Sequence, residues 1–453
     1  MFRDVTLPLW LLVLLVLFAT VTFASHFLLP SVRWFLRRRM EHAVARLNRR
    51  LARPIQPFKL AARTDTIQRV IYDPAVASAV TRHARERGLR EDVAFQRARA
   101  YAREIVPGFS ASVYFDVAIR AARWLSTRLY DVRVVADERV DSIPPDAAVV
   151  FVMNHRSNMD YVLVTYLAAD RSVLSYAVGE WARVWPLSSL IRSMGAYFIR
   201  RRERNALYRR VLARYVQLAT EEGVTQAIFP EGGLSQDGRL AAPRLGLLSY
   251  IIEGARSGGR PVVFVPVALN YDRIIEDRVL TEAAATGDRR FRGSLRTGAA
   301  FALRWIWRRA RGKARRFGIA AVQFGAPVPL QDMAPSGEGP EPERVAAELM
   351  ARLDALVPVL PVPLVSAVLA QAGGALPRGE LLARCRALAP EGPVQIGAAE
   401  LEAAIDMLEL RRLIVSTPAG LAVRSECRAL LAFYAASAEG RLAATATAEL
   451  AAI

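Results

Sequence analysis

Residues 147–161 read AAVVFVMNHRSNMDY, a run of seven apolar residues followed at once by a polar cluster. A short apolar run rich in β-branched residues is typical of a strand that is buried on both faces, as in a parallel sheet. Polar residues at the carboxyl end of such a strand lie where open α/β sheets form their ligand sites. The segment therefore predicts both the class of fold and the location of a functional site.

Similar short runs recur on both sides of this strand and alternate with longer stretches of helical pattern. The predicted strands are 132–136, 147–153, 173–178, 197–199, 225–229, 262–269 and 319–324. Helical patterns lie between them at 160–169, 185–194, 203–222 and 244–257. This alternation predicts an α/β domain over residues 131–330, with a mostly parallel sheet flanked by helices.

The segments outside this domain are mainly helical in pattern. Residues 33–130 combine a basic amphipathic stretch with a helical region, and residues 345–453 form an Ala/Leu-rich helical region. Residues 331–344 contain a stretch rich in Pro, Gly and Glu and form the predicted linker. Residues 413–423 have the pattern of a small hairpin, as in a winged-helix module. The tip of that hairpin lacks basic residues, so nucleic acid is not an expected partner.

The chain carries a formal net charge of +19 and only two cysteines, Cys385 and Cys427. The charge indicates an anionic partner, such as a lipid surface, a phosphorylated substrate or nucleic acid, although a general preference for arginine would give the same total. Two isolated cysteines exclude a disulfide framework. Without a CxxC motif or a Cys/His cluster, we expect no metal site.

The N-terminal segment has the composition of a membrane span. No charged residue lies between Leu7 and Pro30, and at about 1.5 Å per residue this run is long enough to cross a bilayer core. A cleaved signal peptide is the alternative, but Arg3 is offset by Asp4, so a positive n-region is absent. Arginines follow the span instead. By the positive-inside rule, we predict a single-pass transmembrane anchor over residues 1–32 in the cytoplasmic (inner) membrane, with the α/β domain facing the cytoplasm.

Apolar residues also recur at near-helical spacing among the arginines that follow the span. From Trp34 to Leu51 this pattern predicts a basic amphipathic helix that lies on anionic membrane lipids and ends near Pro54. Residues 299–316 combine Trp305 and Trp307 with seven basic residues. That composition fits a lipid headgroup region and equally fits a helix that packs its aromatic side chains on the sheet.

Histidine is scarce, and His155 is the only one in the predicted α/β domain. Imidazole is the side chain best suited to accept a hydroxyl proton near neutral pH. Side chains five residues apart on one helix diverge by about 140°, so His155 and Asp160 meet only across a turn. Asp160 would then orient the imidazole and stabilise the imidazolium. The alternative is a capping box, in which Ser157 caps a helix and Asp160 closes the box.

Three further polar segments follow predicted strands in order. They are residues 195–201 (GAYFIRR), 229–233 (FPEGG) and 265–273 (VPVALNYDR). Together with residues 154–161, this set resembles the four sequence blocks of the glycerolipid acyltransferase family. That family includes glycerol-3-phosphate, dihydroxyacetone-phosphate and lysophosphatidate acyltransferases. The resemblance spans about residues 132–330.

The resemblance implies a role for several of these residues. His155 would be the general base and Asp160 its orienting partner, while Arg201 would bind the phosphate of the acceptor. Glu231 and Gly232 would shape the acceptor site, and Pro266 would help to form the acyl pocket. These roles agree with the chemistry, because a phosphate matches an arginine fork and the Gly232-Gly233 pair lets backbone N–H groups approach an oxyanion.

The third block extends through Ser235 to Leu248, a long form that resembles the glycerol-3-phosphate and dihydroxyacetone-phosphate branch. Residues 430–434 (LLAFY) are similar to a C-terminal block of that branch. Leu234 departs from the family pattern, because it stands where an arginine for the acceptor phosphate is common. Arg239 and Arg244 are the candidates to replace that arginine.

From this resemblance we expect transfer of a fatty acyl group from acyl-CoA or acyl-carrier protein to the sn-1 hydroxyl of glycerol 3-phosphate. No metal or redox cofactor is implied. The alternative within the family is acylation of 1-acylglycerol 3-phosphate, which uses the same chemistry. Outside the family, the alternatives are an inactive membrane scaffold and a basic nucleic-acid binder.

Deleting residues 1–30 should leave a folded protein that still binds membranes, because the predicted domain begins long after Pro30. The basic helix from Arg33 to Arg53 would hold it to anionic lipid, an attraction that salt screens within about 8 Å at physiological ionic strength. Flotation with anionic vesicles at increasing salt measures this binding. Complete release that does not depend on salt would contradict a peripheral role for the helix.

Overall fold

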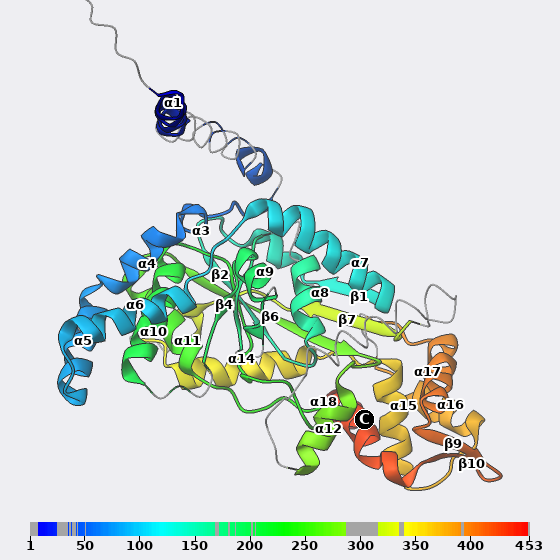
Figure 1. The fold of residues 1–453 in the computed structure, drawn as a ribbon. Coiled ribbons are helices and arrows are strands. Elements are labelled where there is room, and N and C mark those ends of the chain that lie inside the picture. The colour runs from blue at the N-terminus through cyan, green and yellow to red at the C-terminus, as the bar shows by residue number, and fades with distance from the viewer. Residues whose placement is uncertain are drawn as a thin grey trace, which may run out of the picture. The chain divides into compact units, whose positions relative to one another are not determined.

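The computed structural model describes residues 8–24, 35, 38, 42, 44–49, 51–167, 172–179, 182–185, 187–200, 203, 205–286, 316–334, 339–390 and 394–451. The chain divides into two compact units, Met1–Ile55 and Gln56–Ile453. The first unit contains α1 (Leu9–Phe23), and the second contains the sheet and the other elements labelled in Figure 1.

The described part of the predicted anchor is α1, a helix of 15 residues rich in Leu, Val and Phe. Residues 25–30 of the predicted span lie outside the described residues, as do nine residues of the stretch 33–53 and the Trp/Arg segment up to residue 315. Within the described part of the chain, no single helix has both the length and the apolar character to cross a membrane. One helix pair bent by 90°, Pro342–Leu356 with Pro361–Ala372, meets these criteria only jointly.

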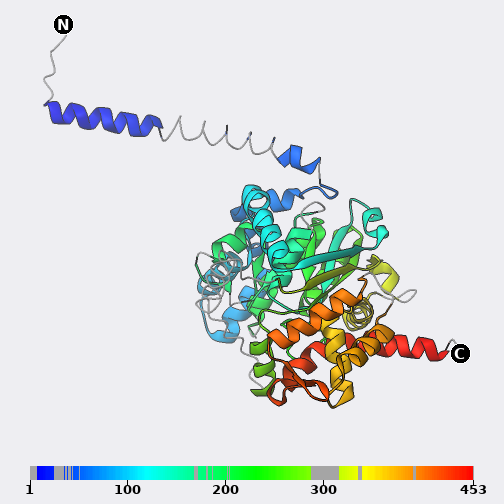
Figure 2. The same cartoon turned by 90° about the vertical axis from the view of Figure 1, so that its right-hand side faces the viewer.

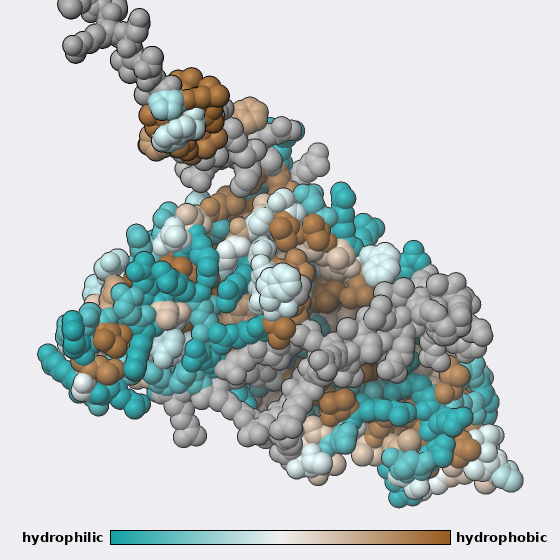
Figure 3. Space-filling view, in the orientation of Figure 1, coloured by the Kyte–Doolittle hydropathy of each residue, from teal (hydrophilic) through white to brown (hydrophobic). Residues whose placement is uncertain are grey.

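The second unit begins with helices, of which the earlier ones pack in the hydrophobic cluster on one face of the sheet and the last packs in the cluster on the other face. They are α3 (Pro57–Leu60), α4 (Arg63–Ile71), α5 (Pro74–Arg87), α6 (Glu91–Ile105), the π-helical η2 (Val113–Ala118) and α7 (Ile119–Leu129). α5 has clear end signals, since the Asp73 side chain accepts a hydrogen bond from the Ala75 N–H at 2.9 Å and Gly88 ends the helix at φ 60°. Hydrophilic side chains predominate over α5 and α6 on the face shown in Figure 3.

An eight-stranded sheet forms the centre of this unit, as Figure 1 shows. Its strands are β1 (Asp131–Ala136), β2 (Ala148–Met153), β3 (Ser175–Val178), β4 (Tyr197–Phe198), β5 (Gln226–Ile228), β6 (Val262–Tyr271), β7 (Ile319–Phe324) and β8 (Val328–Pro329). The order is β1-β7-β6-β2-β5-β3-β4, and β8 pairs with β6. All pairings are parallel except those of β6 with β7 and β8. The seven predicted strands and the mostly parallel sheet are therefore confirmed, and β8 is an addition.

The helices between the strands also match the predicted pattern. They are α8 (Met159–Leu167), α9 (Leu187–Ser193), α10 (Ala206–Glu221) and α11 (Gly246–Gly258), and the unpredicted α12 (Asp277–Thr286) follows β6.

β2 is buried on both faces, as its composition predicts. Val149 and Phe151 face one hydrophobic cluster, whereas Val150 and Val152 face the cluster that contains α10 and α11.

The C-terminal region packs into the same cores. Its elements are η5 (Leu330–Met333), α14 (Pro342–Leu356), α15 (Pro361–Ala372), α16 (Arg378–Leu388), α17 (Ala398–Leu410), β9 (Ile414–Thr417), β10 (Gly420–Val423) and α18 (Arg428–Ala451). The predicted hairpin is present, because β9 and β10 pair antiparallel. Val365, Leu408 and Phe433 share a hydrophobic cluster with Phe151 of the central strand. Figure 2 shows these elements, coloured from yellow through orange to red, packed alongside the sheet.

Candidate active site

The site is built at the carboxyl end of β2, where the chain leaves the sheet before α8 begins. The Asn154 side chain fixes this exit by two hydrogen bonds to β6. Its Nδ2 donates to the Leu269 carbonyl at 2.9 Å, and its Oδ1 accepts from the Leu269 N–H at 2.7 Å. Residues 154–158, here called the catalytic loop, therefore start from a defined point on the sheet.

His155 and Asp160 meet across the turn between β2 and α8. Nδ1 of His155 lies 2.9 Å from Oδ2 of Asp160, and the two side chains are 2% and 0% exposed. An ionised carboxylate only accepts hydrogen bonds, so Nδ1 carries the proton and Nε2 presents its lone pair. The geometry thus gives His155 the tautomer of a general base.

Asp160 also closes a capping box at the start of α8. Its Oδ2 accepts hydrogen bonds from the backbone N–H groups of Arg156 at 2.7 Å and Ser157 at 3.0 Å, while the Met159 N–H donates to Ser157 Oγ at 3.1 Å. The catalytic pair and the capping box are therefore not alternatives. One carboxylate both starts the helix and orients the imidazole.

Tyr271, at the end of β6, completes the shell around this carboxylate. Its hydroxyl donates to Oδ1 of Asp160 at 2.7 Å. Burial, and then the charge of Asp160, raises the pKa of Tyr271 well above its ordinary value, so the hydroxyl stays protonated and remains a donor. The sequence placed Tyr271 in the fourth block but gave no reason to connect it to Asp160.

Glu276 holds the catalytic loop from the side of α12. It accepts hydrogen bonds from Ser157 Oγ at 2.7 Å, from the Asn158 N–H at 3.2 Å and from Asn158 Nδ2 at 2.9 Å. Burial raises the pKa of this carboxyl group. Sequence reasoning missed Glu276. The only available signal was its position soon after the fourth block.

Glu231 joins the catalytic loop to the third block. One carboxylate oxygen accepts from the His155 N–H at 2.8 Å and the other from the Ala241 N–H at 2.9 Å. Burial raises the pKa of Glu231 to about 7. Both oxygens are thus occupied by backbone donors, which fix the two loops relative to each other.

Aromatic side chains surround the imidazole of His155. The Phe229 ring lies 4.3 Å and the Tyr161 ring 5.2 Å from it, centroid to centroid. The Tyr161 hydroxyl is 3.4 Å from Nε2, at the long end of hydrogen-bond geometry. The basic nitrogen therefore faces a mainly apolar space with one hydroxyl nearby.

The glycines and Ser235 of the third block shape its turn. Gly232 adopts φ 67°, and a Cβ there would lie 2.6 Å from Arg244 Cδ, so a side chain would clash in addition to the strained backbone; Gly233 follows in the same turn. The Ser235 N–H donates to the His155 carbonyl at 2.9 Å, and Ser235 Oγ donates to the Arg239 carbonyl at 2.7 Å. Ser235 therefore ties its own loop to the catalytic loop.

The other predicted site residues are farther from the imidazole or already paired. Arg239 forms an ion pair with Glu439, and Arg244 packs its side chain over Gly232. Pro266 is buried in β6, beside Val152 of β2. Arg201, the predicted phosphate ligand, lies outside the described residues.

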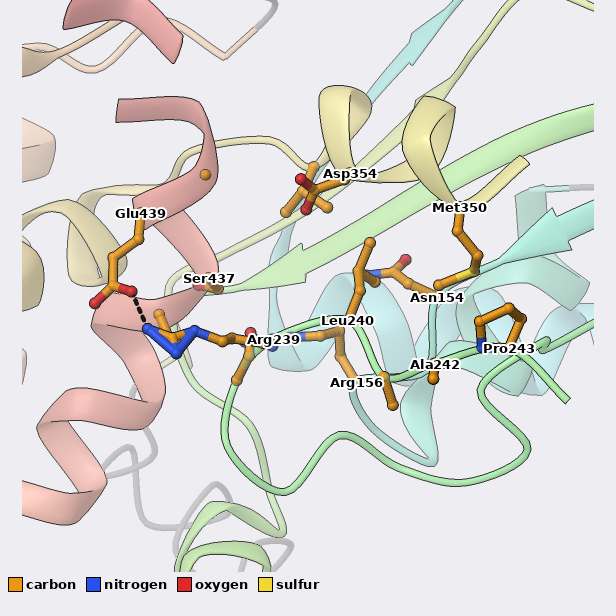
Figure 4. Close-up of a pocket in the computed structure, with 15 residues that line it drawn as sticks. Asn154, Arg156, Arg239, Leu240, Ala242, Pro243, Met350, Asp354, Ser437 and Glu439 are labelled. Carbon is orange, nitrogen blue, oxygen red and sulfur yellow. Dashed lines mark hydrogen bonds and ion pairs between the residues drawn. The ribbon is translucent and has the colours of Figure 1, made fainter. Parts of the chain in front are cut away.

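A cavity of about 600 Å³ lies next to the catalytic loop, between the 238–243 segment, α14 and α18. Figure 4 shows Asn154, Arg156, Leu240, Met350 and Ser437 among its lining residues. Arg156 donates to the Gly238 carbonyl, but its Nε and Nη2 have no partner within the described part of the chain. Burial lowers the pKa of this guanidinium group. The cavity is thus lined by a buried cation that has two nitrogens without a partner among the described residues.

Among the residues that the structure describes, no group of three or more His, Cys, Asp or Glu side chains could hold a metal ion.

Residues 132–270 match a family model described as Acyltransferase, and the matched segment includes His155, Asp160 and Glu231. Among solved structures, the chain is similar to the crystal structure of the 1-acyl-sn-glycerophosphate (LPA) acyltransferase PlsC from Thermotoga maritima. That similarity has 21% identity and a TM-score of 0.33, and it covers 53% of this chain and 75% of that chain.

Replacing His155 with alanine should abolish acyl transfer while the protein stays folded, because Nε2 of His155 is the atom that would accept the proton of the acceptor hydroxyl. Asp160→Asn should lower kcat by about a hundredfold or more, through loss of imidazole orientation. Activity assays combined with the thermal midpoint measure both effects. His83→Ala, which removes a histidine on α5, is the control. Near-normal activity of a folded His155→Ala protein would refute the assignment.

The raised pKa of Glu231 predicts a pH dependence of stability. The folded protein keeps this proton up to about pH 7, whereas the unfolded chain loses it near pH 4.3, so the free energy of unfolding falls as pH rises between these values. The full effect is about 4 kcal/mol. Glu231→Gln should flatten the decline of the thermal midpoint between pH 5 and 7.

Burial also raises the pKa of Asp272, to about 6. The thermal midpoint of Glu231→Gln should therefore still decline with rising pH, but less than that of the wild type. Glu282→Gln, which changes an exposed carboxylate on α12, is the matched control and should keep the wild-type slope. An unchanged slope in Glu231→Gln would show that this carboxyl group titrates normally.

Proposed function

We propose that residues 132–270, which match the Acyltransferase family model, form the catalytic domain of an O-acyltransferase that esterifies a hydroxyl group of a glycerol phosphate. The observation that carries this proposal is the buried His155–Asp160 pair, in which Nδ1 of His155 lies 2.9 Å from Oδ2 of Asp160. An acyl transfer of this kind needs one base for an alcohol and no oxidant or cofactor.

In the proposed reaction, Nε2 of His155 removes the proton from the acceptor hydroxyl as its oxygen attacks the thioester carbonyl. The C–O bond forms and a tetrahedral oxyanion results, while Asp160 stabilises the imidazolium. Collapse of the intermediate breaks the C–S bond, and the imidazolium returns its proton to the thiolate. The Tyr161 hydroxyl, 3.4 Å from Nε2, is a side-chain donor close to the base.

The low exposure of the pair supports transfer to an alcohol rather than hydrolysis. His155 and Asp160 are almost fully buried, and aromatic rings cover the imidazole. Bulk water has little access to such a site, which protects the thioester until an acceptor hydroxyl is in position. The same environment strengthens the interaction of Asp160 with the imidazolium.

Glycerol 3-phosphate is the proposed acceptor, with acyl-CoA or acyl-carrier protein as donor. Two features that resemble the glycerol-3-phosphate branch lie together beside the catalytic loop. The extended third block provides the segment up to Pro243, and Phe433 of the C-terminal block packs on Arg156, 5.2 Å from ring to guanidinium carbon. Both features therefore belong to the surroundings of the base.

One observation favours 1-acylglycerol 3-phosphate as a second candidate acceptor. Leu234 packs against the hydrophobic core instead of presenting a cation, and the cavity has apolar lining from Leu240, Pro243 and Met350. An acceptor that already carries an acyl chain needs apolar surface of this kind.

We also propose that the protein acts at the cytoplasmic (inner) membrane, with the apolar helix α1 as its anchor and anionic lipids as partners of the basic residues that follow. Both the acyl donor and the product have long apolar chains, so catalysis beside a bilayer gives them a place to partition. Nucleic acid has no part in this proposal.

The acceptor is tested by competition between glycerol 3-phosphate and 1-acylglycerol 3-phosphate for labelled acyl-CoA. With glycerol 3-phosphate as acceptor, Leu234→Arg should be tolerated or should tighten acceptor binding. Arg201→Ala should raise its KM about ten- to hundredfold, because one charged hydrogen bond contributes roughly 1.5–3 kcal/mol. Arg209→Ala, which removes an exposed charge from α10, is the control.

A preference of the wild type for 1-acylglycerol 3-phosphate, together with damage by Leu234→Arg, would assign the second acceptor instead. Failure of both acceptors, with retained thioester binding, would exclude glycerol phosphates as substrates.

A further inference from the structure

We propose that Tyr434 and Arg411 of the C-terminal region are positioning residues, which hold the catalytic loop in its active geometry through Asp277 and Glu276. This inference rests on the proposed acyl transfer for its activity readout only. The contacts that support it belong to three elements that are distant in sequence: α12, α17 with the residue that ends it, and α18.

Asp277 is the point where these elements meet. Its Oδ2 accepts hydrogen bonds from the Tyr434 hydroxyl and from the Arg411 guanidinium, and the Asp277 and Arg411 side chains are 5% and 8% exposed. Arg411 also donates to the Tyr434 oxygen at 3.1 Å, and the Ile274 N–H donates to the same oxygen at 3.1 Å. The cluster is closed, since each of its polar groups has a partner.

The cluster connects directly to the catalytic loop. Asp277 is covalently next to Glu276, whose carboxylate accepts three hydrogen bonds from Ser157 and Asn158. Ser157 in turn donates its backbone N–H to Asp160 at 3.0 Å. A displacement of Asp277 therefore moves the group that fixes the middle of the loop between His155 and Asp160.

The residue before Tyr434 contacts the other flank of the loop. The Phe433 ring lies 5.2 Å from the guanidinium carbon of Arg156, and Arg156 donates to the Gly238 carbonyl. The backbone is equally close, because a Cβ at Gly238 would lie only 1.9 Å from the Phe433 carbonyl oxygen. Two successive residues of α18 thus reach both sides of the catalytic loop.

The buried ion pair and its hydrogen bonds oppose displacement of the cluster around Asp277. Arg411 and Asp277 compensate each other in a buried environment, with Arg273, Tyr130 and Glu276 as the other ionisable neighbours. Loss of either partner would leave an unpaired buried charge, whereas loss of the Tyr434 hydroxyl alone would leave the Ile274 N–H without its acceptor. Proton transfer depends steeply on position, so a shift that barely affects stability can still slow catalysis.

The test compares Tyr434→Phe with the wild type in the full-length protein. We expect kcat to fall about tenfold, with little change in the KM of either substrate and with a fall in the thermal midpoint similar to that of the control below. Tyr114→Phe is the matched control. It removes an equally buried hydroxyl, which accepts from the Leu174 N–H at 3.3 Å away from the catalytic loop, and it should leave kcat unchanged.

A second readout is independent of activity. The Nδ1 proton of His155, hydrogen-bonded to Asp160, gives a downfield NMR resonance that His155→Ala identifies in protein labelled with ¹⁵N-histidine. Tyr434→Phe should shift this resonance and Tyr114→Phe should not. Arg411→Lys, which keeps the charge but loses the planar fork, should give a smaller shift in the same direction.

The outcomes separate the two proposals. A lowered thermal midpoint in Tyr434→Phe and Arg411→Lys, with an unmoved His155 resonance and normal kcat, would overturn the positioning role. A shifted resonance supports that role even if glycerol phosphates prove not to be acceptors, in which case only the proposed function fails.

Discussion

Four donors converge on the carboxylate of Asp160, and the rest of the site depends on that convergence. The imidazole, two backbone N–H groups and the Tyr271 hydroxyl all point to one buried carboxylate. A buried carboxylate is costly unless its hydrogen bonds are made, so the donors that stabilise the carboxylate of Asp160 also fix the loop around it. The orientation of His155 thus follows from the hydrogen bonds with which the protein stabilises the Asp160 carboxylate.

The donors stay in place because the loop is tied to elements on every side. Asn154 binds it to β6, Glu231 binds it to the third block, and Glu276 binds it to the start of α12. Glu231 and Glu276 are buried carboxyl groups whose oxygens accept from loop donors. In a medium of low polarity such bonds are strong and their loss is expensive, which favours a single arrangement of the site. The price of this rigidity is the raised pKa of both groups.

Periodicity and composition predicted the sheet because burial on both faces leaves a local signature, as in residues 147–153. The same reasoning brought His155 and Asp160 together but treated the capping box as an alternative, although one carboxylate forms both. Tyr271 and Glu276 were missed because their partners are more than 100 residues away in sequence, and no local pattern encodes such a contact. The hairpin at residues 413–423 was predictable, whereas the docking of α18 against the loop was not.

The arginines near the site show most clearly what the sequence could not predict. The sequence offers Arg239 and Arg244 by motif position, but position says nothing about whether a guanidinium is available. Arg239 would have to give up Glu439 before binding another anion, and Arg244 is spread over Gly232. Arg156 differs, since two of its nitrogens have no partner among the described residues, and each unmet buried donor costs about 1–3 kcal/mol. Tertiary pairing, rather than the count of positive charges, therefore decides which cations near the base can act on a ligand.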